Sequence, residues 1–376
     1  MRIDIATPNS RTVSDRSVGR PNASIDMVIE QLAGSIAERI AGSYAALLLV
    51  GAAGRGEWTI GADGALLSDL DFLVVLPQRQ IVSALLAEHR CRARLRSLSS
   101  MFTQLAPGGV SIGFANAAPR YWTVATPLMW ELRTGARVLD GRDDVRLWPT
   151  IACAEQIPQW EGIRLVANRI SELLGALADD AGSQDALATR RVRYACTKLA
   201  LACSEAQLID ARRYQASYRA RQQEHQYIAD RFSPAQNQLL AAAYCAKLNG
   251  AQDEAADTLT TAIANTLDLA IATLNSLGLH SPADLAARTR AVSPAAPGYA
   301  TDLCFFAMQC LQGHQVPPRR AIAPVYAQAI RLAREIAGNP AALQPGSHLA
   351  DSCKRLYQAY KQAPQVVSII RAGATV

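Results

Sequence analysis

A strand, turn and strand pattern between residues 47 and 76 constrains the fold of this chain more than any other feature. The segment reads LLLVGAAGRGEWTIGADGALLSDLDFLVVL: an apolar run, a glycine-rich turn, and a second apolar run that opens with two acids. Because side chains alternate along a strand, Asp69 and Asp71 are predicted to share one face and their apolar neighbours the other. The pattern therefore predicts two strands with two carboxylates directed at one point.

The acid pair is a candidate metal site. Two close carboxylates repel each other unless a cation lies between them, and hard oxygen ligands on a short strand suit Mg²⁺, with Mn²⁺ as the second choice. Gly51, Gly54 and Gly56 supply a turn in which backbone N–H groups can approach phosphate oxygens without a Cβ in the way. A solvated acidic turn and an ordinary glycine loop would explain each half alone. Their combination in one unit favours a functional site.

Together, the glycine turn and the acids resemble the signature of the polymerase-beta-type nucleotidyltransferases, especially the small bacterial branch with a glycine-arginine-glycine-glutamate turn. The residues that carry the resemblance are Gly51-Ala52, Gly54-Arg55-Gly56-Glu57 and Ser68-Asp69-Leu70-Asp71. Residues 126–141, TPLMWELRTGARVLDG, are similar to the helix and closing strand of such domains, and residues 198–221 resemble the helical half that follows. The resemblance implies an α/β (α+β) nucleotidyltransferase domain with a mixed sheet, followed by an all-α helical bundle.

The resemblance also implies roles for individual positions. Asp69 and Asp71 would be the metal ligands and the catalytic residues, and a nucleoside triphosphate, with ATP expected, would be the co-substrate. The positions expected to bind it are Gly51, Ala52, Gly54, Arg55, Gly56, Glu57, Ser68, Lys198 and Tyr218. Among them, Arg55 and Lys198 are the expected phosphate contacts, and Glu57 would either hold the turn through Arg55 or approach the acceptor.

Two departures from the family pattern bear on activity. The family usually has a serine after the first glycine of the turn, where this chain has Ala52. It also usually has a third acid on a later strand, expected here in residues 108–114, but no Asp or Glu occurs between Glu88 and Glu131. Two carboxylates can hold a metal with substrate phosphates, yet they leave no evident base for an attacking hydroxyl. Either the substrate or Glu57 completes the site, or activity is reduced or lost.

The chain divides into two halves with different patterns: strands and helices alternate in the first, and helices dominate the second. We expect a flexible tail at residues 1–24, a nucleotidyltransferase-like catalytic domain at 25–147 and a helical C-terminal domain at 148–376. In the first half, the pattern predicts helices near 25–42, 80–97 and 127–134 and strands at 46–50, 69–76 and 110–114. In the second half, Ser233-Pro234 and Ser281-Pro282 are typical of helix starts, and Gly250 and Gly278 of helix ends.

One further group of residues is expected in the helical half. Val192, Cys196, Leu199, Cys203 and Ala206 are spaced as the buried stripe of a helix, and Lys198 lies off that stripe, free to project toward a cleft. Tyr214, Ser217, Tyr218 and Arg221 would share a face if that segment is helical. They are candidates to close over a triphosphate, or they form an ordinary solvated basic face.

Composition limits the partners. The net charge is +6, and basic residues crowd one stretch, which favours a triphosphate over RNA because no aromatic stacking platform accompanies them. The crowded residues are Arg190, Arg191, Arg193, Lys198, Arg212, Arg213, Arg219 and Arg221. The cysteines form no C-x-x-C pair, which indicates core packing in a reducing cytoplasm, and no apolar stretch reaches the ~20 residues that cross a bilayer.

The sequence therefore predicts a Mg²⁺-dependent nucleotidyltransferase. It would transfer an NMP from an NTP to a hydroxyl of a small-molecule or protein acceptor and release pyrophosphate. An enzyme that acts on RNA is one alternative. A catalytically inactive relative that still binds nucleotide is the other, suggested by Ala52 and the missing acid.

Overall fold

The computed structural model describes residues 23–60, 66, 68–78, 81–106, 108–117, 125–180, 186–250, 258–280, 322–339 and 348–362. The expected tail at residues 1–24 lies outside this part, except for Ala23 and Ser24, which belong to the first helix. Ser281-Pro282, one of the expected helix starts, also lies outside it.

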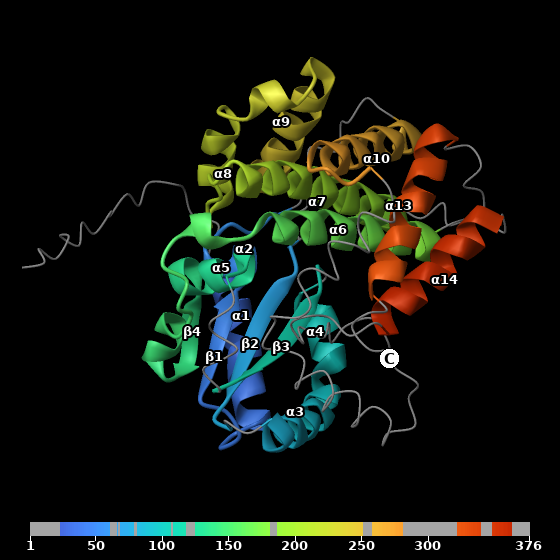
Figure 1. The fold of residues 1–376 in the computed structure, drawn as a ribbon. Coiled ribbons are helices and arrows are strands. Elements are labelled where there is room, and N and C mark those ends of the chain that lie inside the picture. Colours follow the sequence, from blue (N-terminus) through green and yellow to red (C-terminus); the bar gives the residue numbers. More distant parts are fainter. Residues whose placement is uncertain are drawn as a thin grey trace, which may run out of the picture.

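A four-stranded mixed sheet forms the centre of the first half (Figure 1). Its strands are β1 (Ala46–Val50), β2 (Leu70–Leu76), β3 (Val110–Asn116) and β4 (Arg137–Gly141), in the order β3-β2-β1-β4. β1 is antiparallel to both β2 and β4, whereas β3 runs parallel to β2. The chain is therefore a mixed α and β protein, as the sequence predicts, and β2 begins one residue later than expected.

The helices of the first half connect and cover these strands. They are α1 (Ala23–Arg39), the single turn α2 (Gly51–Gly54), α3 (Ile81–Leu95), α4 (Ser99–Leu105) and α5 (Pro127–Gly135), with 3₁₀ turns η1 (Arg96–Leu98) and η3 (Asp143–Leu147). α5 begins where the sequence predicts, because Thr126 accepts a hydrogen bond from the N–H of Met129 at 3.2 Å and proline occupies the first helical position. The sequence pattern did not predict α4.

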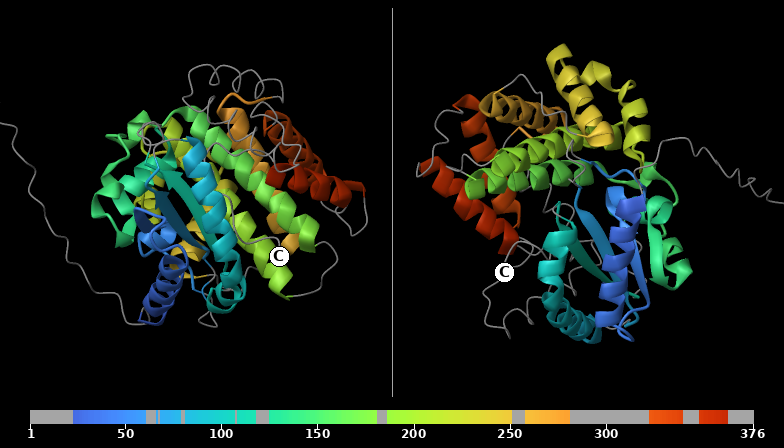
Figure 2. Two further views of the ribbon diagram at one scale, coloured as in Figure 1. Left: turned by 90° about the horizontal axis from the view of Figure 1, so that it is seen from below. Right: turned by 180° about the vertical axis from the view of Figure 1, so that it is seen from behind.

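The two faces of the sheet bury different sets of side chains. Leu49 and Phe72 belong to the core shared with α1 and α3, and the view from behind in Figure 2 shows α1 lying over the strands. Leu48 and Leu73 point to the opposite core, which also contains Ile209 from the second half. By alternation along β2, Asp71 lies on the same face as Leu73 and is thus directed to the side where the helical half packs.

Helices make up most of the described second half. They are α6 (Gln159–Asp180), α7 (Ala186–Asp210), α8 (Tyr218–His225), α9 (Pro234–Asn249), α10 (Leu259–Ser276), α13 (Ile322–Gly338) and α14 (His348–Gln362), with 3₁₀ turns η4 (Ala154–Gln156) and η5 (Ala229–Arg231). Figure 1 shows α6 and α7 lying across one end of the sheet. None of the helices among the described residues combines the length and apolar character needed to span a membrane.

Several expected features of these helices are present. The predicted stripe of α7 is buried along its length: Val192, Cys196, Leu199, Cys203 and Ala206. Ser233 forms a capping box with Gln236 at the start of α9, and Gly250 ends that helix with a φ of 91°. Gly278 follows α10 with a φ of 78°.

The expected helical face of Tyr214, Ser217, Tyr218 and Arg221 is wrong as local structure. α7 ends at Asp210, and Arg212 has a left-handed φ of 60°. Ser217 caps α8, its hydroxyl accepting from the N–H of Ala220 at 3.3 Å, so Tyr214 and Ser217 lie before the helix. Tyr214 still meets Arg221, whose Nη2 donates to its hydroxyl at 2.7 Å.

Candidate functional site

The glycine turn begins directly beside Asp71. Val50, the last residue of β1, pairs with Asp71, so the next residue, Gly51, passes the Asp71 carboxylate. Gly51 has a φ of +64°, and a Cβ built on it would lie 2.9 Å from Oδ2 of Asp71. This position therefore requires glycine for two reasons, the backbone conformation and the close approach to the acid.

Gly51→Ala and Gly56→Ala separate these two reasons. Both glycines have a positive φ, but a Cβ on Gly56 would meet nothing within 4 Å. We expect each variant to lose about 1–2 kcal/mol of unfolding free energy from left-handed strain. Only Gly51→Ala should also weaken the predicted binding of Mg²⁺ together with nucleotide, because it displaces Asp71. Urea unfolding measures the change in stability, and isothermal titration measures the affinity for Mg²⁺ with nucleotide. Equal affinities in the two variants would contradict this role of Gly51.

Asp69 and Lys198 lie in contact. The ammonium of Lys198 donates to both carboxylate oxygens of Asp69, at 3.2 and 3.1 Å, from α7 to the residue that precedes β2. The side chain of Lys198 is 20% exposed and that of Asp69 is 30% exposed, so the pair is partly open to solvent. The Lys198 ammonium also lies 4.6 Å from the centre of the Tyr194 ring. The structure thus brings together Asp69, Lys198 and Tyr194, a residue that the sequence analysis did not single out.

A second lysine, Lys247, lies behind the acid pair. Its ammonium donates to the Ser68 hydroxyl at 3.1 Å, and that hydroxyl also accepts from the N–H of Thr59 at 2.7 Å. Burial lowers the pKa of Lys247 to about 8, opposed by the attraction of Asp69. Ser68 is completely buried. We infer that the buried Ser68 hydroxyl holds the Lys247 ammonium close to Asp69, on the interior side of the acid pair.

Lys247 was not among the predicted site residues, although the sequence around it carries a signal. Leu240, Ala243, Tyr244 and Lys247 are all buried and follow the spacing of one helical face. A lysine on such an apolar stripe requires a polar or charged partner in the interior. That partner could not be identified from the sequence because Ser68 is 179 residues away.

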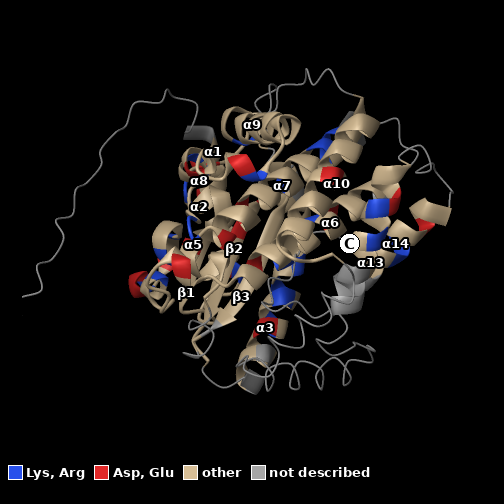
Figure 3. Ribbon diagram, turned by 45° about the horizontal axis from the view of Figure 1, so that its top comes forward, with Lys and Arg blue, Asp and Glu red and all other residues tan. Residues whose placement is uncertain are grey.

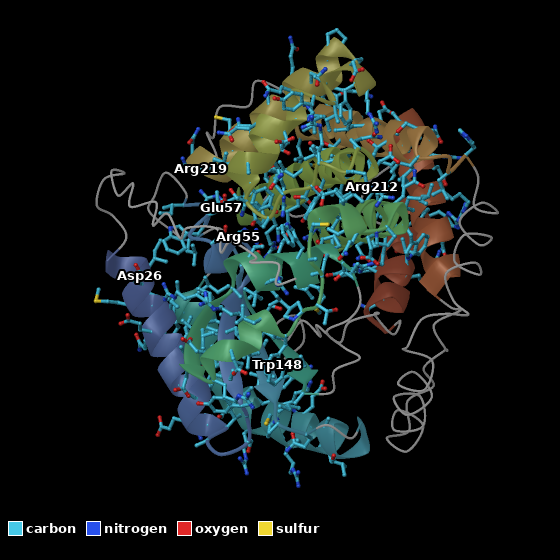
Figure 4. All side chains as sticks on the ribbon, turned by 60° about the vertical axis from the view of Figure 1, so that its left-hand side comes forward. Asp26, Arg55, Glu57, Trp148, Arg212 and Arg219 are labelled. Atoms are coloured by element: carbon cyan, nitrogen blue, oxygen red, sulfur yellow. The ribbon has the colours of Figure 1, made fainter. Side chains whose placement is uncertain are left out.

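Arg55 of the turn pairs with two acids, and Glu57 bonds to the helical half. Nε of Arg55 lies 3.1 Å from Glu57, and Nη1 lies 2.9 Å from Glu131 on α5. Glu57 accepts from the Ser217 hydroxyl at 2.6 Å and from the N–H of Tyr218 at 3.0 Å. Figure 4 shows Glu57 and Arg55 close together, below Arg219 of α8. Of the two roles expected for Glu57, these contacts favour holding the turn.

Arg221 completes a buried charged cluster. Its side chain is 1% exposed and forms ion pairs with Glu131 and Glu205. The Tyr214 hydroxyl donates to Glu131 at 2.5 Å. The Tyr218 ring lies against the same guanidinium, 4.6 Å from its carbon to the ring centre. Figure 3 shows acidic and basic segments next to each other where α7 and α8 meet. We define Arg55, Glu57, Glu131, Glu205 and Arg221 as the charged cluster.

The ionisation of Glu131 follows from this cluster. Burial raises the pKa of Glu131, but the two guanidiniums of Arg55 and Arg221 lower it more, to about 2. Burial also raises the pKa of Glu57, yet hydrogen bonds from Ser217 and Tyr218 leave it below its usual value. Burial dominates at Glu205 and raises its pKa.

The stabilising effect of Glu131 should depend on pH. Its pKa is depressed in the folded chain, so its contribution is complete above the unfolded value near 4.5 and is lost as pH falls toward 2. We expect the difference in unfolding free energy between the wild type and Glu131→Gln to shrink as pH falls from about 5 to about 2. Urea unfolding at stepped pH measures it, and a constant difference would refute the assignment.

β3 contains the segment in which the family resemblance implies a third acid. β2 and β3 pair in parallel with Asp71 beside Ser111, which places their side chains on one face. Gly109, with a φ of +103°, precedes β3, and its carbonyl accepts from the N–H of Leu70 at 2.9 Å. Ser111 thus stands next to Asp71 where a third acid would complete the set.

The donor set fits one kind of metal binding. Across the described residues, no three or more His, Cys, Asp or Glu side chains group closely enough to enclose a metal ion. Mg²⁺, however, is usually held by one or two carboxylates together with substrate phosphates and water. Asp69 and Asp71 therefore fit a metal that arrives with phosphate, and not an all-protein cage.

The crowded basic stretch does not form one surface. Arg213 pairs with Glu224 at 2.6 Å, and Arg212 donates to the carbonyls of Glu155 and Ile157. Arg221 is buried in the charged cluster, and Lys198 contacts Asp69. At least these four residues of the stretch are thus engaged within the fold.

No protein-family model matches this chain, and no curated protein is similar enough to it to be counted as a relative.

Proposed function

We propose that the protein is a Mg²⁺-dependent nucleotidyltransferase of the polymerase-beta type, with ATP as its first expected co-substrate. The observation that carries the proposal is the arrangement at the start of β2. A Cβ at Gly51 would lie only 2.9 Å from the Asp71 carboxylate, and Lys198 contacts Asp69. Two acids, a glycine turn and lysines at one point are suited to binding a nucleotide's phosphates with a metal.

The residues have distinct tasks in this reaction. A bound Mg²⁺ would be held by Asp69 and Asp71 and would offset charge on the phosphates. Lys198 and Lys247 add positive charge on the helical side. The acceptor hydroxyl oxygen forms a bond to the α-phosphorus, and the bond to the leaving pyrophosphate breaks. Because β3 offers Ser111 and no carboxylate, the proton passes to water, and the rate lacks the roughly 10²–10⁴-fold gain of a general base.

A second function is nucleotide binding without transfer, and it is favoured by the lack of a third acid on β3. Ser111 stands beside Asp71, and Ala52 replaces the usual serine of the turn. The RNA alternative has less support, since residues of the basic stretch such as Arg213 and Arg221 are used in internal ion pairs.

Two measurements test the proposal. Isothermal titration of each NTP, with and without Mg²⁺, should give metal-dependent binding, strongest for ATP. Incubation with labelled ATP and candidate acceptors should then release pyrophosphate and add the mass of one NMP to an acceptor. Binding without pyrophosphate release across small-molecule, protein and RNA acceptors would favour the inactive relative. A folded chain that binds no NTP would refute both functions.

A further inference from the structure

The position of Lys198 resembles that of a bound cation. Its ammonium lies at nearly equal distances, 3.2 and 3.1 Å, from the two oxygens of Asp69. A divalent metal on Asp69 would use the same oxygens. Lys198 and a metal therefore compete for one carboxylate.

The charges around the acid pair balance without any ligand. Asp69 and Asp71 contribute two negative charges, and Lys198 and Lys247 contribute two positive charges. Arg169 also attracts Asp69, but its charge is matched by Glu172, with which it pairs at 2.5 Å. A divalent metal alone would leave this group with a surplus of positive charge. A metal that carries a triphosphate would not, because the phosphates bring more negative charge than the metal neutralises.

We propose that Lys198 is an internal counter-ion that excludes free divalent metal from the acid pair and transfers its contact to phosphate when metal and nucleotide bind together. The inference rests on the proposed nucleotidyltransfer and adds its order of binding. Lys198 would act as a positioning and selecting residue: it releases Asp69 only when a phosphate replaces the carboxylate as its partner.

Lys198 is better placed for this exchange than Lys247. Its side chain is 20% exposed, and a lysine ammonium turns on a flexible four-carbon stem. Lys247 differs, since its residue is 5% exposed and Ser68 holds its ammonium in the interior. Lys198 is thus the movable charge, and Lys247 is the fixed one.

Mn²⁺ is a suitable probe because its free form is detected directly by electron paramagnetic resonance. The wild type should bind Mn²⁺ weakly alone and more tightly with ATP. Lys198→Met should bind Mn²⁺ alone about tenfold to a hundredfold more tightly than the wild type, the range by which one nearby charge shifts an ionic equilibrium. The increase in Mn²⁺ affinity that ATP causes should be smaller in Lys198→Met than in the wild type.

Two control variants isolate the charge. Lys198→Arg keeps the cation and should leave the affinity for Mn²⁺ alone weak, and Lys354→Met removes an exposed lysine on α14 and should leave Mn²⁺ binding unchanged. Unchanged Mn²⁺ affinity in a folded Lys198→Met that still binds Mn²⁺ with ATP would overturn the counter-ion role and leave the proposed function intact. A folded wild type that binds no Mn²⁺ with ATP would overturn the proposed function and this inference with it.

Discussion

Asp69→Asn and Asp71→Asn should each abolish metal-dependent nucleotide transfer while the chain stays folded. Both changes keep the size of the side chain and remove one negative charge from the start of β2. Metal stabilisation of charge on transferring phosphates is worth several kcal/mol, so transfer should fall by about 10³-fold or more. Mg²⁺-dependent ATP binding, followed by isothermal titration, should be lost in both variants.

The two variants should differ in the stability of the ligand-free chain. Asp71→Asn relieves repulsion between neighbouring carboxylates and should leave the melting temperature equal or higher. Asp69→Asn also removes the partner that Lys198 contacts at 3.1 Å, so it should gain nothing. Asp26→Asn, which alters a half-exposed pair with Arg137, is the matched control and should bind ATP normally. Unaltered Mg²⁺-dependent binding by a folded Asp71→Asn would rule out the metal site.

Local signals made the centre of this site predictable. Alternation of apolar and acidic residues located β2 to within one residue, and the glycines located the turn that follows β1. Glycine fits position 51 because it adopts a positive φ at no steric cost. Lys198 was recognised because it lies beside the apolar stripe of its helix, and the residues of that stripe are buried.

Contacts between distant segments could not be predicted in the same way. Arg221 reaches Glu205 and Glu131, which lie 16 and 90 residues away, and no periodic pattern records such pairings. The family resemblance implied that Arg55 contacts phosphate. In the folded chain its side chain is 7% exposed and serves Glu57 and Glu131. These tertiary ion pairs could not be read from the local sequence, and the phosphate contact of Arg55 stays a prediction.

Arg221→Met should be among the most destabilising single changes in this chain. Methionine has a similar length but no charge, so Glu205, which is 5% exposed, would lose its ion-pair partner in the interior. Removal of one partner of a buried ion pair typically costs about 3–5 kcal/mol, because the remaining charge is left uncompensated. The loss should appear in urea unfolding. It should also raise hydrogen exchange at Tyr218, whose N–H bonds to Glu57 beside the charged cluster.

A compensating variant separates lost charge balance from lost packing. Arg221→Met combined with Glu205→Gln removes the uncompensated carboxylate and should recover part of the stability, whereas a packing defect would persist or grow. Arg142→Met breaks an exposed pair with Asp144, whose side chains are 60% and 51% exposed, and should have little effect. If Arg221→Met were as stable as Arg142→Met, the charged cluster would not hold the glycine turn against the helical half. The fixed geometry of the acid pair would then need another support.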